Sequence, residues 1–469
     1  MRKILLGTTA VVGAALLGPT MAQAQEAPTV RIGGYFRAAY GYVQQSGAHS
    51  DTSTGGSGLP TDVSGGTSNI AGSGTNMARL GKHDFSTDAE IHVFVNGKLA
   101  NGLTYGAVIE IEFDQQEGRN IVQQRASTGK TTAALDEMWA FIAHPSFGQI
   151  RFGDEDGALA LMQAGWISNF GSGGVHGWWE SFVTRQRGAR TTTTPDGIGD
   201  NTKIVYLSPQ FFGFDFGASF ALNANTGEDV GCPNNSASGW CDRAYAFAGA
   251  SNFGIYAAGP EQAARRNEYQ IAARWRGQLG PVGLAISGGY LGSGAARDIT
   301  TAGGLGARQV NVFNGLNVWT IGAQATAYGF TLGAAWVYGD YNFFWDNTFR
   351  GDQKGNQYTI GASYTAGPFT VGANYVFGTF AGGSARSIAT TGPFAGSLVQ
   401  NLTSANNATM RRYGWGIGAN YRLAPGLDLI AEFVQYRVRE GRRDLDPVQP
   451  GVQTRADAQV FILGTRLAF

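Results

Sequence analysis

The sequence predicts an all-β protein: a single closed barrel of 16 antiparallel strands that crosses a membrane, with short turns at one end and long loops at the other. Three observations predict this fold. Apolar and polar residues alternate over many segments, short and long connections alternate between those segments, and many charged residues fall on the polar face. After the N-terminal region, no run of 18 or more apolar residues provides a transmembrane helix.

The alternation has the two-residue period of a β-strand, in which successive side chains point to opposite faces. In YTIGASYTAGPFTVGANYVF, from Tyr358 to Phe377, Ile360 and Val371 belong to an apolar face, and Asn374 belongs to a small, mostly polar face. The same pattern recurs in residues 30–42, 85–95, 103–113, 214–222, 269–275, 282–290, 319–325, 330–338, 413–421, 427–433 and 461–469.

The connections between these segments fall into two length classes. Short turns are expected at residues 100–102, 144–148, 209–213, 277–281, 328–329, 366–368 and 424–426. Long loops rich in Gly, Ser, Thr and Asn are expected at residues 45–83, 115–134, 154–202, 224–267, 292–315, 340–356, 379–410 and 439–456. Short periplasmic turns and long extracellular loops are typical of outer-membrane barrels, whereas a soluble sandwich has no reason to segregate them. Strands of about 10 residues, tilted about 40°, cross an apolar band of about 25 Å.

The polar face predicts a water-filled interior. Its charged and polar members are Arg37, Glu90, His92, Glu110, Glu112, Asp215, Asn223, Gln270, Arg274, Gln324, Asn374, Arg412, Asn420, Glu432 and Arg466. A packed core would lose several kcal/mol for each unpaired buried charge, whereas an aqueous lumen would not. About 16 strands leave such a channel open.

The N-terminus has the three parts of a secretory signal. Arg2 and Lys3 precede an apolar stretch, and Ala22-Gln23-Ala24 offers small residues for cleavage, which we expect after Ala24. The alternative is a retained N-terminal anchor. Residues 25–469 then form one barrel domain with 32 basic and 34 acidic residues, a charge of −2 that gives no net attraction to nucleic acid.

The two cysteines, Cys232 and Cys241, lie in GEDVGCPNNSASGWCDR. In an exported protein we expect a disulfide between them, which would contribute roughly 2–3 kcal/mol. A metal or redox pair is the alternative, but it lacks CxxC spacing and a nearby His.

Several stretches resemble the Gram-negative trimeric porins, especially the general porins of alphaproteobacteria. These stretches are TVRIGGYFRAAYGYV (first strand), LANGLTYGAVIEIEF (second turn and strand), SFGQIRFGDEDGA (the strand before the third loop), NTKIVYLSPQFFGFDFGASFAL (the hairpin after it) and VFILGTRLAF (the last strand). Each motif is weak alone, and their order carries the likeness over nearly all of the mature chain.

The resemblance implies a homotrimer of 16-stranded barrels in the outer membrane, surrounded by lipid, that passes small hydrophilic solutes and ions by diffusion. It implies neither enzymatic activity nor a cofactor. The C-terminal residues are similar to the signal read by the barrel-assembly machinery, a partner during biogenesis, and here they are Phe461, Leu463, Leu467 and Phe469. Phe469 is also explained as one more lipid-facing aromatic residue.

The resemblance places a constriction loop at residues 154–202, folded into the lumen. In the family, acids of this loop face basic residues of the wall and set a transverse field. The candidate residues are Asp154, Asp156 and Glu180 on the loop and Arg37, Arg274 and Arg412 on the wall. The loop has NFGSGG in place of the enterobacterial PEFGG-type sequence and carries arginines of its own, so the sign of the field stays open, and these charges are also explained as solvated loop residues.

The alternatives to a diffusion channel are an enzyme, a substrate-specific channel and a secreted soluble β-protein. STGKTT (Ser127 to Thr132) resembles the end of a phosphate-binding loop, but Gln124 stands where glycine is required. His92 with Asp88 and Glu90 on one strand face indicates acid–base or metal chemistry only if a further partner joins them, and otherwise a cluster of lumen charges. A barrel-form hydrolase lacks a visible Ser–His pair. A substrate-specific channel and a secreted soluble β-protein remain as alternatives, distinguished by saturating conductance and by solubility without detergent.

Overall fold

The computed structural model describes part of the chain, and the strands, helices, contacts and distances given below belong to that part. The described residues are 27–46, 82–113, 133–183, 195–223, 265–294, 298–299, 309–310, 314–341, 345, 348, 351–381, 386–388, 398–400, 409–440 and 455–469.

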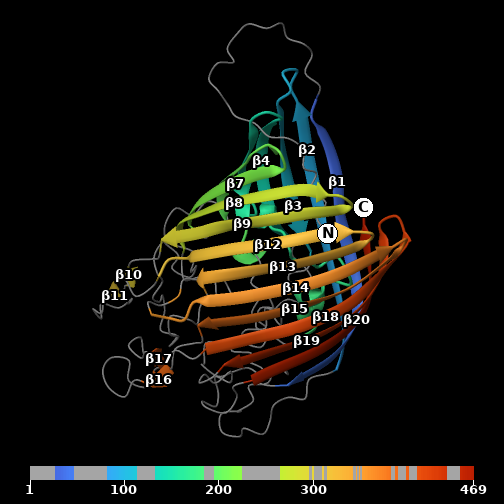
Figure 1. Cartoon of the computed structure of the whole chain (residues 1–469), viewed down its shortest axis with the longest axis vertical. Coiled ribbons are helices and arrows are strands. Elements are labelled where there is room, and N and C mark those ends of the chain that lie inside the picture. The colour runs from blue at the N-terminus through green and yellow to red at the C-terminus, as the bar shows by residue number, and fades with distance from the viewer. Residues whose placement is uncertain are drawn as a thin grey trace.

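Sixteen strands form one closed antiparallel barrel, as the sequence predicts. Each strand pairs with its neighbours in chain order, and β1 pairs with β20 to close the sheet. Figure 1 shows β8, β9, β12, β13, β14 and β15 lying side by side in the wall. The strands are β1 (Thr29–Ser46), β2 (His83–Lys98), β3 (Thr104–Glu112), β4 (Ala134–His144), β5 (Gly148–Asp154), β6 (Thr202–Leu207), β7 (Phe214–Asn223), β8 (Arg266–Leu279), β9 (Val282–Gly294), β12 (Asn317–Ala327), β13 (Phe330–Asp340), β14 (Gly355–Ala366), β15 (Phe369–Ala381), β18 (Thr409–Ala424), β19 (Leu427–Glu440) and β20 (Arg455–Ala468).

The seven predicted short turns all connect neighbouring barrel strands, and the eight predicted long connections lie between the other pairs. In the tightest turn, Tyr328 and Gly329 both have positive φ, 51° and 84°, as a two-residue hairpin requires. Two small hairpins lie outside the barrel sheet: β10 (Asp298–Ile299) with β11 (Gln309–Val310), and β16 (Arg386–Ile388) with β17 (Leu398–Gln400).

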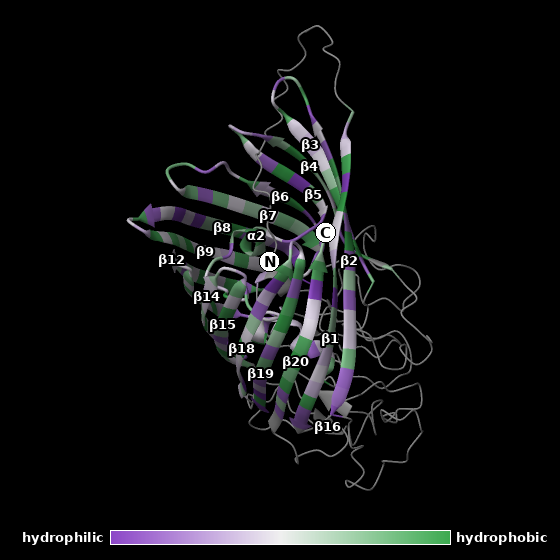
Figure 2. Ribbon diagram, turned by 90° about the vertical axis from the view of Figure 1, so that its right-hand side faces the viewer, coloured by the Kyte–Doolittle hydropathy of each residue, from purple (hydrophilic) through white to green (hydrophobic). Residues whose placement is uncertain are grey.

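The barrel wall has its apolar side chains on the outside and its polar side chains on the inside, the reverse of a soluble protein. Ile360 and Val371 on the β14–β15 hairpin are 59% and 47% exposed, whereas Thr359 and Asn374 on the other face are buried. Figure 2 shows the resulting bands of hydrophobic and hydrophilic residues along the strands. Because large apolar side chains cover the outside, lipid is the solvent that this surface fits.

The polar face is covered by chain segments between β5 and β6. These segments are α2 (Ala158–Met162), η1 (Gly174–His176), η2 (Trp178–Phe182) and η3 (Pro195–Ile198). None of the helices in the described part of the chain is long and apolar enough to cross a bilayer.

Candidate functional site: the segment inside the barrel

The described residues between β5 and β6, 155–183 and 195–201, lie against the inner wall, and they are called the inner segment below. Its helix α2 contacts β6 to β9, η1 contacts β15, β18 and β19, and η2 contacts β1, β2 and β20. These strands lie on widely separated parts of the barrel, so the segment crosses the lumen. Figure 2 shows α2 within the ring of strands.

Wall side chains hold the beginning of the inner segment by its backbone. The amides of Ala158 and Leu159 donate to Ser219 Oγ at 3.2 Å and to Gln270 Oε1 at 3.0 Å. These N–H groups belong to the first turn of α2, which has no intrahelical acceptors for them. The wall therefore caps the helix, and β7 and β8 fix where it begins.

A glycine turn holds the middle of the segment. The Glu432 carboxylate accepts hydrogen bonds from the amides of Ser172 and Gly174, both at 2.8 Å, and from the Ser172 hydroxyl at 2.5 Å. Gly171 and Gly174 have φ of 53° and 62°, and a Cβ on Gly171 would lie 2.2 Å from Glu432 Oε2. Glycine is thus required for close approach, which gives the NFGSGG stretch a structural role.

Asn374 on β15 completes this anchor. Its Oδ1 accepts from the Val175 amide at 3.0 Å, and its Nδ2 donates to the carbonyls of Ile167 and Gly173, each at 2.9 Å. A buried side-chain amide that satisfies three backbone groups fixes both position and orientation. The segment is therefore tied to β15 and β19 through polar contacts.

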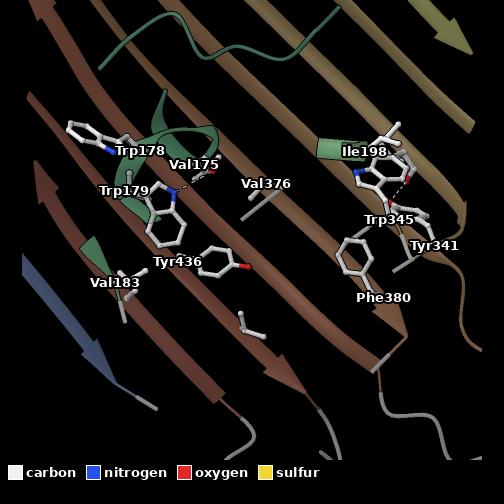
Figure 3. Close-up of a cluster of buried hydrophobic side chains, with 14 of the residues drawn as sticks. Val175, Trp178, Trp179, Val183, Ile198, Tyr341, Trp345, Val376, Phe380 and Tyr436 are labelled. Carbon is white, nitrogen blue, oxygen red and sulfur yellow. Dashed lines mark hydrogen bonds between the residues drawn. The ribbon is translucent and has the colours of Figure 1, made fainter. Parts of the chain in front are cut away.

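Apolar contacts add to these bonds at two places, both drawn in Figure 3. Trp179 packs against Tyr436 of β19, with ring centroids 5.2 Å apart. At the second place, Ile198 of η3 belongs to the same buried cluster as Trp345, which stacks on Tyr341 with ring centroids 4.9 Å apart. Arg265 adds hydrogen bonds to the carbonyls of Ile198 and Trp345, at 2.6 and 2.9 Å. Both clusters of rings therefore pack the inner segment against the wall.

Glycine residues line the inner wall where the inner segment lies on it, and together they are called the glycine track. A Cβ on any of these glycines would come within 3.0 Å of an atom of the inner segment, so the lack of side chains on the wall lets the segment lie close to it. They are Gly217 (against Met162), Gly289 (Leu159), Gly322 (Ala164), Gly333 and Gly361 (Ile167), Gly372 (Phe170), Gly416 (Gly174) and Gly418 (Gly171). This track explains part of the high glycine content.

The three candidate wall arginines all border the inner segment, at separate places. Arg37 pairs with Asp88 of β2 and stacks on Trp178 at 4.4 Å from the ring centroid. Arg274 is held by Asp215 at 2.6 Å, and it also donates to the carbonyl of Leu161 at 3.4 Å.

Arg412 is the most enclosed of the three, with 2% of its surface exposed. It lies near the ring of Phe380, at 5.9 Å from the centroid, and close enough to Tyr436 to act on it electrostatically. Glu180 acts on the same tyrosine. Arg412 and Glu180 therefore share one region, where the wall meets η2.

The two acids at the start of the segment lie elsewhere. Asp154 ends β5 and accepts a hydrogen bond from the Thr202 hydroxyl. Asp156 is buried in a group with Glu137 and Asp200, whose carboxylate oxygens lie within 4.8 Å of one another. The structure thus brings Glu180 near a candidate arginine and sets Asp156 among other acids.

The predicted assembly-signal residues lie on the outside of the barrel. Phe461, Leu463, Leu467 and Phe469 all point to the exposed apolar face. The Phe469 backbone exchanges two 3.1 Å hydrogen bonds with Gly34, so the last residue also seals the barrel. The cysteine pair 232 and 241, the signal region before residue 25, STGKTT and the loop arginines at 185, 187 and 190 lie outside the described residues.

His176 gives the inner segment a pH dependence. Burial lowers the pKa of His176 to about 4, and its Nε2 lies 3.0 Å from the Thr359 hydroxyl of the wall. A released histidine takes up a proton below about pH 6.5, whereas the packed one stays neutral until about pH 4. Stability therefore falls as the pH drops from about 6.5 to 4, by on the order of 2 kcal/mol at pH 5.

Thermal unfolding in detergent at pH 7 and pH 5 checks this expectation. The wild type should lose more stability on acidification than His176→Gln, which keeps a polar side chain but has no titratable group. Equal losses in both proteins would assign the acid sensitivity to other groups.

A family model described as Gram-negative porin matches residues 7–441. No curated protein sequence matches the chain. Among solved structures, a substituted form of the Rh. blastica porin covers 94% of this chain and 100% of its own, with 15% identity and a TM-score of 0.45. A loop-deleted form of OmpT, an outer membrane protein of Vibrio cholerae, covers 95% and 100%, with 10% identity and a TM-score of 0.48.

Proposed function

The chain belongs to the Gram-negative porin family and forms a channel in the outer membrane, and we propose that this channel passes small hydrophilic solutes and ions by passive diffusion. The inner segment acts as the constriction that limits solute size. One observation carries the proposal: the segment is bonded to the wall at Gln270 on β8 and again at Glu432 on β19. A passage crossed by a bonded chain admits only what fits beside it.

The charges along this passage would select among solutes. Glu180 and Arg37 lie beside this passage, with the Arg37 guanidinium over Trp178, and the enclosed Arg412 lies behind Glu180 in the wall region of Tyr436. Opposed fixed charges in a narrow passage order water, disfavour apolar solutes and bias ions by sign. No bond is made or broken in such a passage, so an enzymatic role is not part of the proposal.

The assembly follows the family. We infer a homotrimer in outer-membrane lipid, a cleaved 24-residue signal, a Cys232–Cys241 disulfide, and recognition of the strand ending at Phe469 by the barrel-assembly machinery. The exposed apolar face of β20 supports the last point, because Phe461 and Phe469 are both accessible on it. Mass spectrometry of the purified protein tests the signal, the disulfide and the oligomer together.

Reversal potentials in planar bilayers under a salt gradient test the constriction charges. Glu180→Gln should shift selectivity toward anions, because one negative charge leaves the passage. A charge about 8 Å from the ion path in water contributes about 0.5 kcal/mol, which is roughly a twofold change in the permeability ratio. Asp156→Asn should shift it less, because Asp156 is only 6% exposed.

Asp457→Asn is the control, because Asp457 lies on the outer face of β20 and pairs there with Arg437. Selectivity unchanged by Glu180→Gln would remove this residue from the constriction. Conductance that saturates with one solute would favour a substrate-specific channel instead.

A further inference from the structure

Three side chains that could ligate a metal meet on the inner wall at β2 and β3. Glu90 and His92 are two residues apart on the same face of β2, and Glu110 of β3 stands directly opposite His92 in the strand register. His92 Nε2 lies 2.8 Å from Glu90 Oε2 and 3.6 Å from Glu110 Oε2. All three ligand atoms lie within 4.8 Å of one another. The cluster supplies the further partner that the sequence pattern at His92 requires.

The donor set selects one class of cation. One imidazole nitrogen and two carboxylate oxygens suit Zn²⁺ and similar first-row transition metals, which take three protein ligands and leave a position for water. Ca²⁺ and Mg²⁺ prefer six or more oxygen ligands, so they fit this set poorly. A cluster of carboxylates alone would not favour transition metals over Ca²⁺ and Mg²⁺, whereas the imidazole of His92 does.

Neighbouring groups hold the ligands in place. The Tyr35 hydroxyl of β1 donates to Glu90 Oε1 at 2.7 Å, which leaves Glu90 Oε2 directed toward His92. The ring of Phe94 lies edge-on to the imidazole, with centroids 6.0 Å apart. Such outer contacts orient the ligands of known metal sites and raise their affinity.

The cluster borders the channel water through His92 and Glu90. The side chains of His92, Glu90 and Glu110 are 19%, 14% and 10% exposed, and all three lie on the polar, inward face. The inner segment approaches β2 near Asp88, because Arg37 pairs with Asp88 and lies over Trp178 of η2. An ion in the lumen therefore meets the partly exposed side chains of His92 and Glu90 first, and the buried Glu110 Oε2 lies 3.6 Å from His92 Nε2.

We propose that Glu90, His92 and Glu110 form a binding site for a divalent transition-metal cation on the channel wall. The bound ion adds two positive charges to an acidic part of the wall, and it lowers the passage of other cations. Binding itself does not depend on which solutes the channel carries.

Isothermal titration of the folded, tag-free protein in detergent with ZnCl₂ tests the site. We expect one Zn²⁺ per chain on this site, with affinity at least about tenfold weaker in His92→Gln and in Glu110→Gln. His83→Gln is the matched control, because His83 begins β2 on the face opposite to His92 and pairs with the Tyr40 hydroxyl. This control should bind like the wild type, and CaCl₂ in place of ZnCl₂ should give no comparable binding.

X-ray absorption at the zinc edge gives a second readout, and the expected first shell contains nitrogen and oxygen with one imidazole. Millimolar ZnCl₂ should also lower single-channel conductance in the wild type but not in His92→Gln. The proposal is overturned if His92→Gln and Glu110→Gln, each shown to be folded, bind zinc as the wild type does. It is also overturned if the wild type binds none, or if the shell contains sulfur in place of the imidazole.

Discussion

Replacement of Glu432 by alanine is expected to release the inner segment from β19 and to enlarge the channel. The carboxylate is the acceptor for three hydrogen bonds from Ser172 and Gly174. Each hydrogen bond to a charged group contributes about 1.5–3 kcal/mol, so the loss is on the order of 5 kcal/mol. Single-channel conductance should rise, and liposome swelling should show faster entry of larger sugars.

Two variants of the same strand make this expectation specific. Glu432→Gln keeps one acceptor oxygen in the same place and should give an intermediate effect. Asp428→Asn is the control, because Asp428 lies on the same face of β19 and pairs with Arg422 rather than with the inner segment. If Glu432→Ala leaves conductance and sugar entry at wild-type values, the segment is held elsewhere and Glu432 is not its anchor.

The barrel could be predicted because the sequence patterns of strands and short turns are local. A two-residue period is visible in any stretch of strand, and Ile360 and Val371 reveal the apolar face without knowledge of their neighbours. Short turns also fix register. The turn after Lys98 sets β2 against β3, so the pairing of His92 with Glu110 was within reach of the sequence.

The charge pairs of the site were not predictable in the same way. Arg37 stands opposite Asp88 and Arg274 stands opposite Asp215 in the register, but a long connection joins the strands of each pair. A long loop does not fix register, so the partner of each arginine could not be read from the sequence. The sequence correctly placed these arginines on the inner face, but it could not identify the acids that hold them.

The anchors of the inner segment were missed for a related reason. Glu432, Asn374 and Gln270 were recognised as inward-facing residues and interpreted as channel lining, whereas each binds backbone groups of the segment. The signal that could have found them is the glycine content of Gly171 to Gly174, which predicts close approach to a partner. The identity of that partner depends on how the segment crosses the lumen, and no local pattern encodes that path.

The glycine track leads to the second large expected effect, in Gly322→Leu on β12. A Cβ on Gly322 would lie 1.9 Å from the carbonyl oxygen of Ala164, and the Ala164 amide is already bonded to Ser287 Oγ at 2.8 Å. The oxygen belongs to the backbone, so the inner segment must move away from the wall. Overpacking of this kind costs about 1–3 kcal/mol, and a leucine adds further bulk behind the clash.

Gly288→Leu is the matched control for this substitution. Gly288 pairs with Ile321 on the neighbouring strand and faces outward, where the nearest atom to a new Cβ lies at 3.4 Å, an ordinary contact. Because leucine suits a lipid-facing surface, this variant should keep wild-type conductance and stability. Gly322→Leu should lower the unfolding temperature and change single-channel conductance, since the displaced segment alters the passage. If the two variants behave alike in a folded barrel, the inner segment does not rest on the wall at Gly322, and the close approach of backbone to backbone is not what positions it.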